Sequence, residues 1–514
     1  MAKGIAINVI HGDKKSQNVY TLDEAIEETK YGKFQIILII STGLALMGAA
    51  LENVNVSVVM PYIKCDLNLT TTEQGILGSI SFLGIMSTSY CWGFLADTWG
   101  RQKVIRIAAY GGFIFSLMSA FSFNILILII CRFFAGALLA GVNAGAFSYV
   151  SEFHTMKKAG IATALVTVFV CFIWICIPLL AIVTIPMDWV ISISILEFKP
   201  WRLFLMCNAF VNFWNGILFS FMPETPKFLL VKNRKEEALQ VLSKMYAINT
   251  GEAKMDYPVK DIAFTLLIKN NNMNPGKGCF NIFQLIWKQT KPIFQQPYLA
   301  NTWKLCFIII VIFSIGHGTF MWFTDFMTQV RNNVGPQKTL CEIVGGKIDT
   351  ETVSNSCNIN NKDITVFIML LLVGALFILL SLLSIIGLKH IAPKKLVCGW
   401  MAISMVAGLF LNFLEGFYPI FVDFIIFLSC VLVTTFVMAV AINLYPTQYR
   451  ATATSFIFTC GRLGGVLGSN LVGMLLVGHC EMIFYTFSVV LFTSSLVFLL
   501  IRPESKETST STKD

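Results

Sequence analysis

A short polar turn reads Gly93-Phe94-Leu95-Ala96-Asp97-Thr98-Trp99-Gly100-Arg101-Gln102-Lys103 and separates two apolar blocks. Gly93 allows two helices to approach closely, and Gly100 permits a tight change of chain direction. Asp97 is placed to pair with Arg101, or with the N-terminus of a neighbouring helix. The pattern predicts two consecutive helices joined by a charged turn.

Long apolar blocks dominate the rest of the chain. Its 514 residues are 56% hydrophobic and only 13% charged, whereas soluble domains, whose surfaces face water, are roughly a quarter charged. Helices of about 20 apolar residues cross about 30 Å of hydrocarbon, so the blocks predict about twelve transmembrane spans. The predicted spans are 34–60, 73–95, 104–122, 125–150, 160–185, 202–222, 303–326, 364–386, 396–414, 419–445, 453–477 and 484–501.

The spans fall into two groups of six. They predict an all-α polytopic membrane protein with two pseudo-symmetric six-helix halves, 34–222 and 303–501. A central loop at 223–302 joins the halves, and its periodic apolar residues predict amphipathic helices. A tail at 1–33 with a short helix comes before the halves, and a second tail at 502–514 follows them.

The net charge of +9 fits this topology better than a nucleic-acid ligand. Lys and Arg lie mostly in the tails, the central loop and alternate connecting loops, with no basic stripe on a folded domain. Positive residues favour the cytoplasmic side of a membrane. Both termini and the central loop are therefore predicted to be cytoplasmic.

The turn at 93–103 resembles the loop after the second span of the major facilitator superfamily. The resemblance implies the fold of that superfamily, whose halves rock about a site at the membrane midplane. It also implies that the turn latches the halves together on the cytoplasmic face in the outward-open state. The residues assigned to this gate are Gly93, Asp97, Gly100, Arg101 and Lys103, with Glu152 at the end of the fourth span and Arg450 before the eleventh.

Further segments narrow the resemblance. Those from Pro223 to Leu230 and from Tyr445 to Ala453 are similar to segments of the sugar-porter and organic-ion branches. The start of the first span and Ser151-Glu152-Phe153 resemble the synaptic vesicle glycoprotein 2 group. Vertebrate members of that group carry a long luminal domain where this chain has a short loop at 327–363, and an acidic residue where it has Ala49. We therefore interpret the chain as an invertebrate-type, short-loop relative.

Polar side chains inside the spans are costly in lipid and usually face a cavity or a partner. Glu52 is a candidate for protonation or cation binding, or else a residue near the outer interface, hydrogen-bonded to span five or seven. Arg132 either lines a cavity or extends to the outer interface. His317 lies between two glycines that can break span seven, and it either couples protons or packs between helices. The full set of candidates for solute binding or proton coupling is Glu52, Asn55, Arg132, His317, Trp322, Arg462 and Asn470.

Two features belong to the predicted outer loops. Asn68-Leu69-Thr70 is a glycosylation sequon in the first outer loop. Cys341 and Cys357 share the loop between spans seven and eight, so we predict a disulfide between them in that oxidising compartment.

The function predicted from these features is secondary transport of a small organic solute, such as an organic ion, by alternating access. Coupling to protons through Glu52 and His317 is part of this prediction. Two alternatives stay open: a transporter-shaped vesicle protein that binds and regulates other proteins, and a sugar facilitator. No phosphate-binding loop, dinucleotide fingerprint, metal-ligand spacing or Ser-His-Asp set is recognisable, so we expect neither an enzyme nor a cofactor. The expected partners are the solute, membrane lipid and vesicle proteins, with no nucleic acid, for a monomer in a plasma or vesicle membrane.

Overall fold

The computed structural model describes residues 19–193, 196–262, 290–332, 338–345, 363–387, 393–445 and 447–501. This part of the chain is almost entirely helical, with two short strand pairs. The predicted tail at 502–514 and much of the central loop lie outside the described residues.

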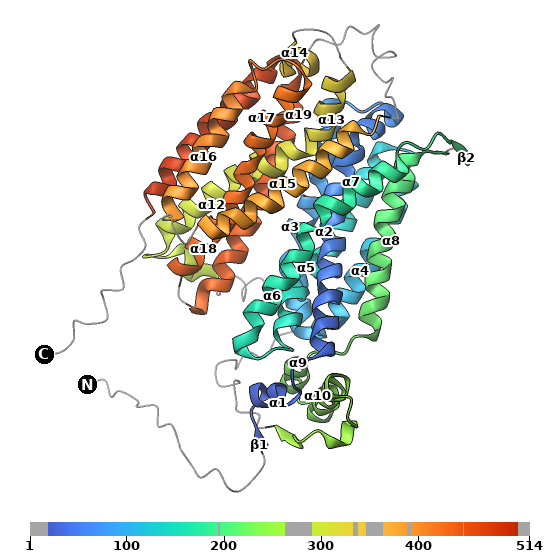
Figure 1. Cartoon of the computed structure of the whole chain (residues 1–514), viewed down its shortest axis with the longest axis vertical. Coiled ribbons are helices and arrows are strands. Elements are labelled where there is room, and N and C mark those ends of the chain that lie inside the picture. Colours follow the sequence, from blue (N-terminus) through green and yellow to red (C-terminus); the bar gives the residue numbers. More distant parts are fainter. Residues whose placement is uncertain are drawn as a thin grey trace, which may run out of the picture.

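The N-terminal half is a bundle of long helices, coloured blue to green in Figure 1. Thr70 and Glu73 form a capping box that starts the second span. The first span continues past its predicted end at 60 to Leu67, where Asn68 adopts the left-handed conformation that ends a helix. The helices are α2 (Lys33–Leu67), α3 (Thr71–Trp99), α4 (Arg101–Ala120), α5 (Ile125–Ser151), α6 (Met156–Cys171), α7 (Ile173–Thr184) and α8 (Pro200–Phe221).

The C-terminal half contains the same kind of bundle with two irregular spans. A π-helical segment, η4 (Ser314–Thr319), interrupts the seventh span, and α19 (Thr447–Leu499) bends at Val477–His479 and so contains two spans. The other elements are α12 (Leu299–Phe313), α13 (Phe320–Asn332), α14 (Leu340–Val344), α15 (Thr365–Gly387), α16 (Pro393–Phe410), α17 (Phe417–Leu428), η5 (Ser429–Leu432) and α18 (Val433–Leu444).

The helices are long and apolar enough to cross a membrane. By length and hydropathy alone, 8 helical segments within the described residues qualify, and one of them, Thr452–Leu499, is long enough for two crossings. With α3, α15 and α16 the bundle has the 12 spans of two six-helix halves.

The two halves stand side by side and meet toward one end of the molecule (Figure 1). We call this end the hairpin face, after the antiparallel pair β2 (Ile191–Ile193) and β3 (Leu196–Phe198). The opposite end is the α10 face, after α10 (Lys235–Thr250). Across the halves α2 contacts α13, α3 contacts α19, and α7 contacts α15. The ribbons of the halves separate toward the α10 face (Figure 1).

Glycines set the closest helix crossings. A Cβ on Gly84 or Gly136 would collide with the backbone at Phe133 or Ser81, so these glycines hold α3 against α5. Gly468 packs in the same way against the carbonyl of Ser314, as predicted for span eleven. Gly93 does not have the predicted role in this conformation, because nothing lies within 4 Å of the position of its Cβ. The side of α3 that carries Gly93 faces open space.

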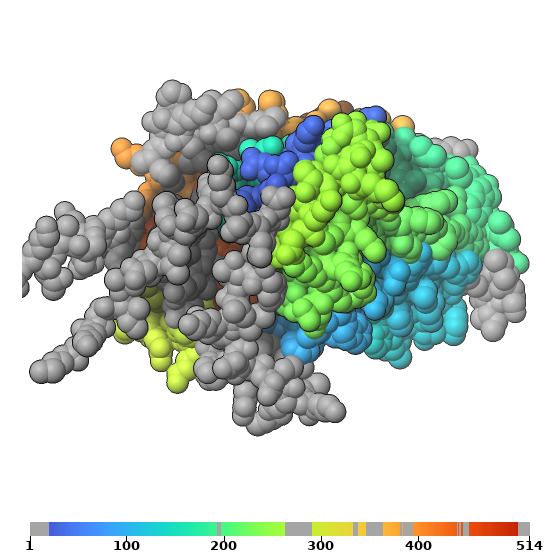
Figure 2. Space-filling view, turned by 90° about the horizontal axis from the view of Figure 1, so that it is seen from below, coloured from blue at the N-terminus to red at the C-terminus, as the bar shows by residue number. Residues whose placement is uncertain are grey.

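A small polar subdomain covers the α10 face of the N-terminal half. It combines α1 (Leu22–Glu28), α9 (Pro226–Val231) and α10 with a parallel strand pair, β1 (Val19–Tyr20) and β4 (Asp261–Ile262). The Asn249 amide of α10 donates to the carbonyls of Thr29 (3.0 Å) and Lys30 (2.7 Å). Seen from this face, the green of residues 222–262 lies against the light blue of α3 and α4 (Figure 2).

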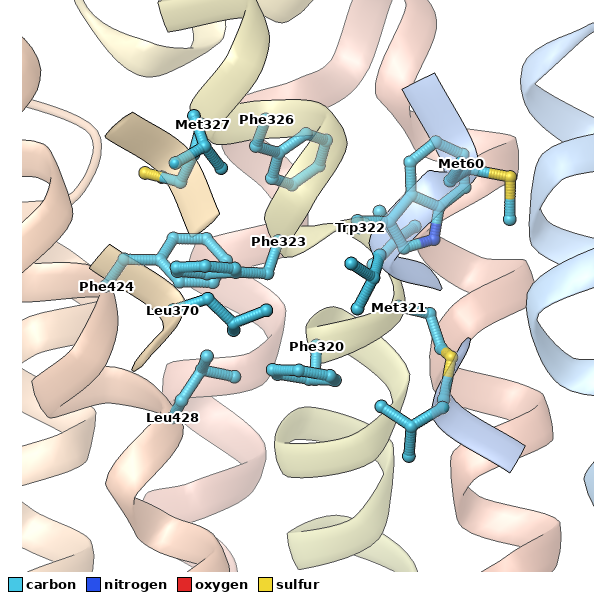
Figure 3. Packing of buried hydrophobic residues seen from close by; sticks show 14 of the residues in the cluster. Met60, Phe320, Met321, Trp322, Phe323, Phe326, Met327, Leu370, Phe424 and Leu428 are labelled. Atoms are coloured by element: carbon cyan, nitrogen blue, oxygen red, sulfur yellow. The ribbon is translucent and has the colours of Figure 1, made fainter. Parts of the chain in front are cut away.

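The largest hydrophobic cluster lies toward the hairpin face and contains residues of both halves. Its centre is the aromatic helix α13, from which Phe323 approaches Phe424, with ring centroids 5.7 Å apart. Figure 3 shows Phe320, Trp322 and Phe326 on the same helix, with Met60 of α2 close by. Apolar contact therefore joins the halves on this side.

Candidate transport site

Three of the predicted gate residues, Asp97, Arg101 and Glu152, form a network at the α10 face. Arg101 at the start of α4 pairs with Asp97 near the end of α3 (2.9 Å) and with Glu152 at the end of α5 (3.1 Å). The hydroxyl of Thr225 donates to the second oxygen of Glu152 (2.6 Å). None of these contacts reaches the C-terminal half.

Glu224 completes this network, although the sequence pattern does not single it out for a role. Its carboxylate accepts the backbone N–H of Arg101 (3.0 Å) and Gln102 (3.2 Å), so it caps the N-terminus of α4. Gly100 has a φ of +110°, and a Cβ there would collide with the carboxylate of Glu224. Burial raises the pKa of Glu224 above its ordinary value despite the amide hydrogen bonds, which lower it.

The other two predicted gate residues make no ion pair that the structure describes. Lys103 is exposed, and no described carboxylate pairs with it. The side chain of Arg450 lies outside the described residues. The predicted latch between the halves therefore remains a prediction about another conformation.

A buried ion pair lies inside the N-terminal half. Glu52 of α2 and Arg132 of α5 are 1% and 0% exposed, and they pair directly. Ser116 of α4 donates to the same carboxylate oxygen (2.6 Å), and Arg132 donates to Asn55 (3.0 Å). Glu52 therefore bonds to spans three and four rather than span five or seven, and Arg132 does not extend to the interface. The interpretations that placed Glu52 and Arg132 at the outer interface were therefore wrong. Each side chain can be buried because the other neutralises its charge.

This polar cluster is not saturated with hydrogen bonds. Within the described residues, one carboxylate oxygen of Glu52, two guanidinium nitrogens of Arg132 and the amide nitrogen of Asn55 are buried without a partner. Unpaired buried polar atoms are costly, and in native proteins they often mark functional sites.

His317 lies in the π-helical segment η4, between the rings of Phe313 (4.5 Å between centroids) and Phe82 (6.0 Å). The predicted helix break is thus a wide helical turn. Such π-helical turns are rare in proteins as a whole, but they occur frequently at functional sites. Phe82 belongs to α3, so the imidazole lies where the two halves meet.

Trp322 is 2% exposed, and its indole N–H donates to the carbonyl of Ser469 (3.1 Å). In this conformation it packs inside the bundle rather than lining a cavity. Its role as a solute-binding residue stays a prediction.

Arg462 and Asn470 of α19 both bond to α3 across the halves. The Asn470 amide donates to Ser79 (2.9 Å) and the Arg462 guanidinium to Ser89 (3.1 Å). No described carboxylate pairs with Arg462, which is only partly exposed. A cationic group thus lies at the boundary of the halves, far from either end of α3 and α19.

Lys64 and Asp325 form a further bond between the halves near the hairpin face, which the sequence pattern does not predict. Their nitrogen and oxygen are 3.5 Å apart, and Asp325 is 2% exposed. Lys64 lies at the end of α2 and Asp325 in α13. An ion pair in this place stabilises contact between the halves.

The predicted disulfide was wrong. Cys341 of α14 bonds to Cys480, which follows the bend in α19, and Cys357 lies outside the described residues. The bend in α19 brings Cys480 beside α14. The sequence shows only which cysteines share a loop, so it could not reveal this contact. Cys65 is also disulfide-bonded. Asn68 is exposed at the end of α2, so its glycosylation stays a prediction.

The fold and these motifs define the class of the protein. The sequence profile of the Major Facilitator Superfamily matches residues 38–469, and the chain belongs to this superfamily. It is therefore a membrane protein of a transporter family rather than an enzyme.

Synaptic vesicle glycoproteins are among the curated relatives of this chain. Synaptic vesicle glycoprotein 2C of Mus musculus is 28% identical over 327 residues, which cover 60% of this chain and 44% of that protein. Synaptic vesicle glycoprotein 2B of Homo sapiens is 26% identical over 330 residues, or 61% and 48%. The chain thus spans about half the length of the curated relatives it matches.

Solved structures share the fold. The xylose transporter XylE from E. coli, in a partially occluded inward-open conformation, gives a TM-score of 0.63 at 13% identity, covering 92% of this chain and 100% of that chain. A bacterial homolog of the human lysosomal transporter Spinster, inward-facing and unoccupied, gives 0.63 at 12% identity, covering 91% and 96%. At these identities the likeness shows the fold alone.

Proposed function

We propose that this chain is a secondary transporter that moves a small organic anion across a membrane by alternating access. The anionic class of the solute is inferred from Arg462, because this guanidinium lies at the boundary of the halves and no described carboxylate neutralises it. An anionic solute that enters between the halves supplies the missing charge. The family membership and the contact of the halves near one face support the mechanism.

Glu52 and Arg132 are the groups we propose for proton coupling. A proton on Glu52 removes the charge that holds Arg132 and frees the guanidinium to form other hydrogen bonds. The shared cluster with Ser116 and Asn55 links spans one, three and four, so a change of charge here alters the packing of the N-terminal half. His317 is a second proton acceptor in this proposal, at the boundary with α3.

Uptake into proteoliposomes tests the proposal with three labelled probes: p-aminohippurate, tetraethylammonium and D-xylose. We expect p-aminohippurate uptake that increases when the outside is acidic, is lost in Arg462→Gln and becomes indifferent to pH in Glu52→Gln. Arg331→Gln is the control, because Arg331 pairs with Asp363 away from these sites (3.1 Å). Uptake of only the cation or the sugar would overturn the anionic class. Wild-type uptake that ignores the pH gradient would overturn the coupling and leave a facilitator.

The regulatory function remains the second candidate, because the matched relatives are named as synaptic vesicle glycoproteins. Under this alternative the chain binds vesicle proteins and none of the three probes crosses the membrane. A vesicle protein that co-purifies in a fixed ratio and is insensitive to Arg462→Gln would favour it.

The topology proposed with this function places the α10 face in the cytoplasm, since exposed lysines gather there. The chain is proposed to act as a monomer in a plasma or vesicle membrane. An epitope tag at either end should be protected from antibody in intact cells and become accessible once the plasma membrane is permeabilised.

A further inference from the structure

Two adjoining cavities lie on the α10 face. They lie where α3 ends and α4 begins, next to the segment that contains α9 and α10. Their volumes are about 590 Å³ and about 440 Å³. Both are lined by Trp99, Lys103, Phe228 and Arg234, so they form one continuous recess. Lys103 and Glu224 line this recess, but the ion pairs that Arg101 makes with Asp97 and Glu152 lie outside its lining.

The recess is strongly basic. Besides Lys103, Lys232 lines the larger cavity, and Lys244 and Lys254 line the smaller one. None of these four lysines forms an ion pair with a residue that the structure describes. The ammonium of Lys232 lies 5.6 Å from the ring centroid of Phe228, which holds it at the cavity wall.

The two carboxylates beside the recess do not cancel this charge. Glu224 is occupied by the N-terminus of α4. Glu237 pairs with Arg234 through two hydrogen bonds of 2.6 and 2.5 Å. The four lysines therefore remain available to a ligand with several negative charges.

The larger cavity has a partly apolar wall. Its apolar lining includes Trp99, which is 52% exposed, and Ile107, which is 41% exposed on the side of α4. Exposed tryptophan marks the boundary between lipid and water in membrane proteins. The smaller cavity lies farther out, beneath α10, where polar residues dominate its lining.

We propose that this recess binds an anionic phospholipid with a phosphorylated inositol headgroup. The diester phosphate lies between Lys103 and Lys232 with the acyl chains against Trp99 and Ile107, and the phosphomonoesters reach Lys244 and Lys254. The cytoplasmic leaflet is the source of such lipids, so the site rests on the proposed placement of the α10 face. It does not depend on transport activity.

Binding of dioctanoyl phosphatidylinositol bisphosphate, dioctanoyl phosphatidylserine and free inositol trisphosphate to the purified full-length protein in detergent tests the site. Each lysine beside anionic lipid contributes about fivefold in affinity, so a double variant should lose roughly 25-fold. K103Q/K232Q should weaken both lipids, because it removes the diester contact. K244Q/K254Q should weaken the phosphoinositide alone.

Two further variants separate the site from general charge and from misfolding. K157Q/K395Q removes two exposed lysines outside the recess and should leave both affinities unchanged. K103R/K232R keeps the charge and should retain binding. The proposal is overturned if the control pair loses as much as the recess pairs, if the phosphoinositide binds no better than phosphatidylcholine, or if free inositol trisphosphate binds as tightly as the lipid.

Discussion

At the residue scale, Glu52 and Arg132 face each other where neither can reach water. A buried carboxylate that loses its partner can take up a proton, whereas a guanidinium cannot give one up. Glu52→Gln should therefore lower the unfolding free energy by about 3–5 kcal/mol, and Arg132→Met should lower it by less. Thermal melting of the purified variants in one detergent measures the difference.

The double variant E52Q/R132M is the control for that prediction. Replacing both partners leaves no isolated charge, so the melting temperature should return toward the wild-type value. If the double variant melts as low as E52Q, the loss comes from packing and the unpaired guanidinium is not its cause.

Glu224 gives a prediction of pH dependence. Burial raises its pKa in the folded protein above the ordinary 4.5, so ionisation of this carboxyl opposes folding. Its contribution to stability is fully present below about pH 4.5 and is lost as the pH rises through the raised pKa. Glu224→Gln cannot ionise, so the variant should gain melting temperature relative to wild type between pH 4 and pH 7. A difference that stays constant over this range would contradict the assignment.

At the scale of elements, the two glycines of the 93–103 turn provide a matched pair. Gly100 starts α4 with a φ of +110° against the Glu224 carboxylate, whereas Gly93 lies in α3 with open space around it. Gly100→Ala should lower the unfolding free energy by about 1–3 kcal/mol. Gly93→Ala should leave it unchanged or raise it by up to about 1 kcal/mol. Equal melting of the two variants would show that the contact with Glu224 is unimportant.

Local patterns of the sequence predict these elements well. Apolar blocks of spanning length predict helices because lipid leaves the backbone no other way to satisfy its hydrogen bonds. Asp97 and Arg101 stand four residues apart on either side of the tight turn at Gly100, so the local pattern alone places their charges together. The glycines of span eleven predict close packing in the same local way.

Contacts between elements that are far apart in the sequence could not be predicted from it. Glu52 and Arg132 are 80 residues apart, and the pattern marks each as costly in lipid without showing that they neutralise each other. Cys341 and Cys480 are 139 residues apart, joined by a bend in α19 that no apolar block shows. Glu224 lies in a recognised segment, but its carboxylate acts on the first turn of another helix.

At the scale of the whole molecule, two sets of polar contacts differ in whether they reach across the halves. The network around Arg101 joins helices of the N-terminal half alone, so it leaves the α10 ends of the halves free to separate. The bonds from Lys64, Ser79 and Ser89 reach the other half. Rocking of the halves therefore requires these bonds between α2, α3 and the C-terminal half to break.

The requirement that bonds between the halves break can be tested by exchanging the charges of Lys64 and Asp325. Lys64→Asp places two carboxylates together and should shift the population toward conformations open at the hairpin face, roughly fivefold or more. Ser79→Cys, buried between the halves, reports the opening through its rate of labelling by a membrane-impermeant maleimide. Lys64→Asp/Asp325→Lys restores opposite charges and should return the labelling rate to that of the reporter alone.

Unchanged labelling in Lys64→Asp would mean that apolar packing around α13 holds the hairpin face shut without help from the ion pair. A fast rate that persists in the exchanged variant would mean that Lys64 acts through its own surroundings rather than through Asp325.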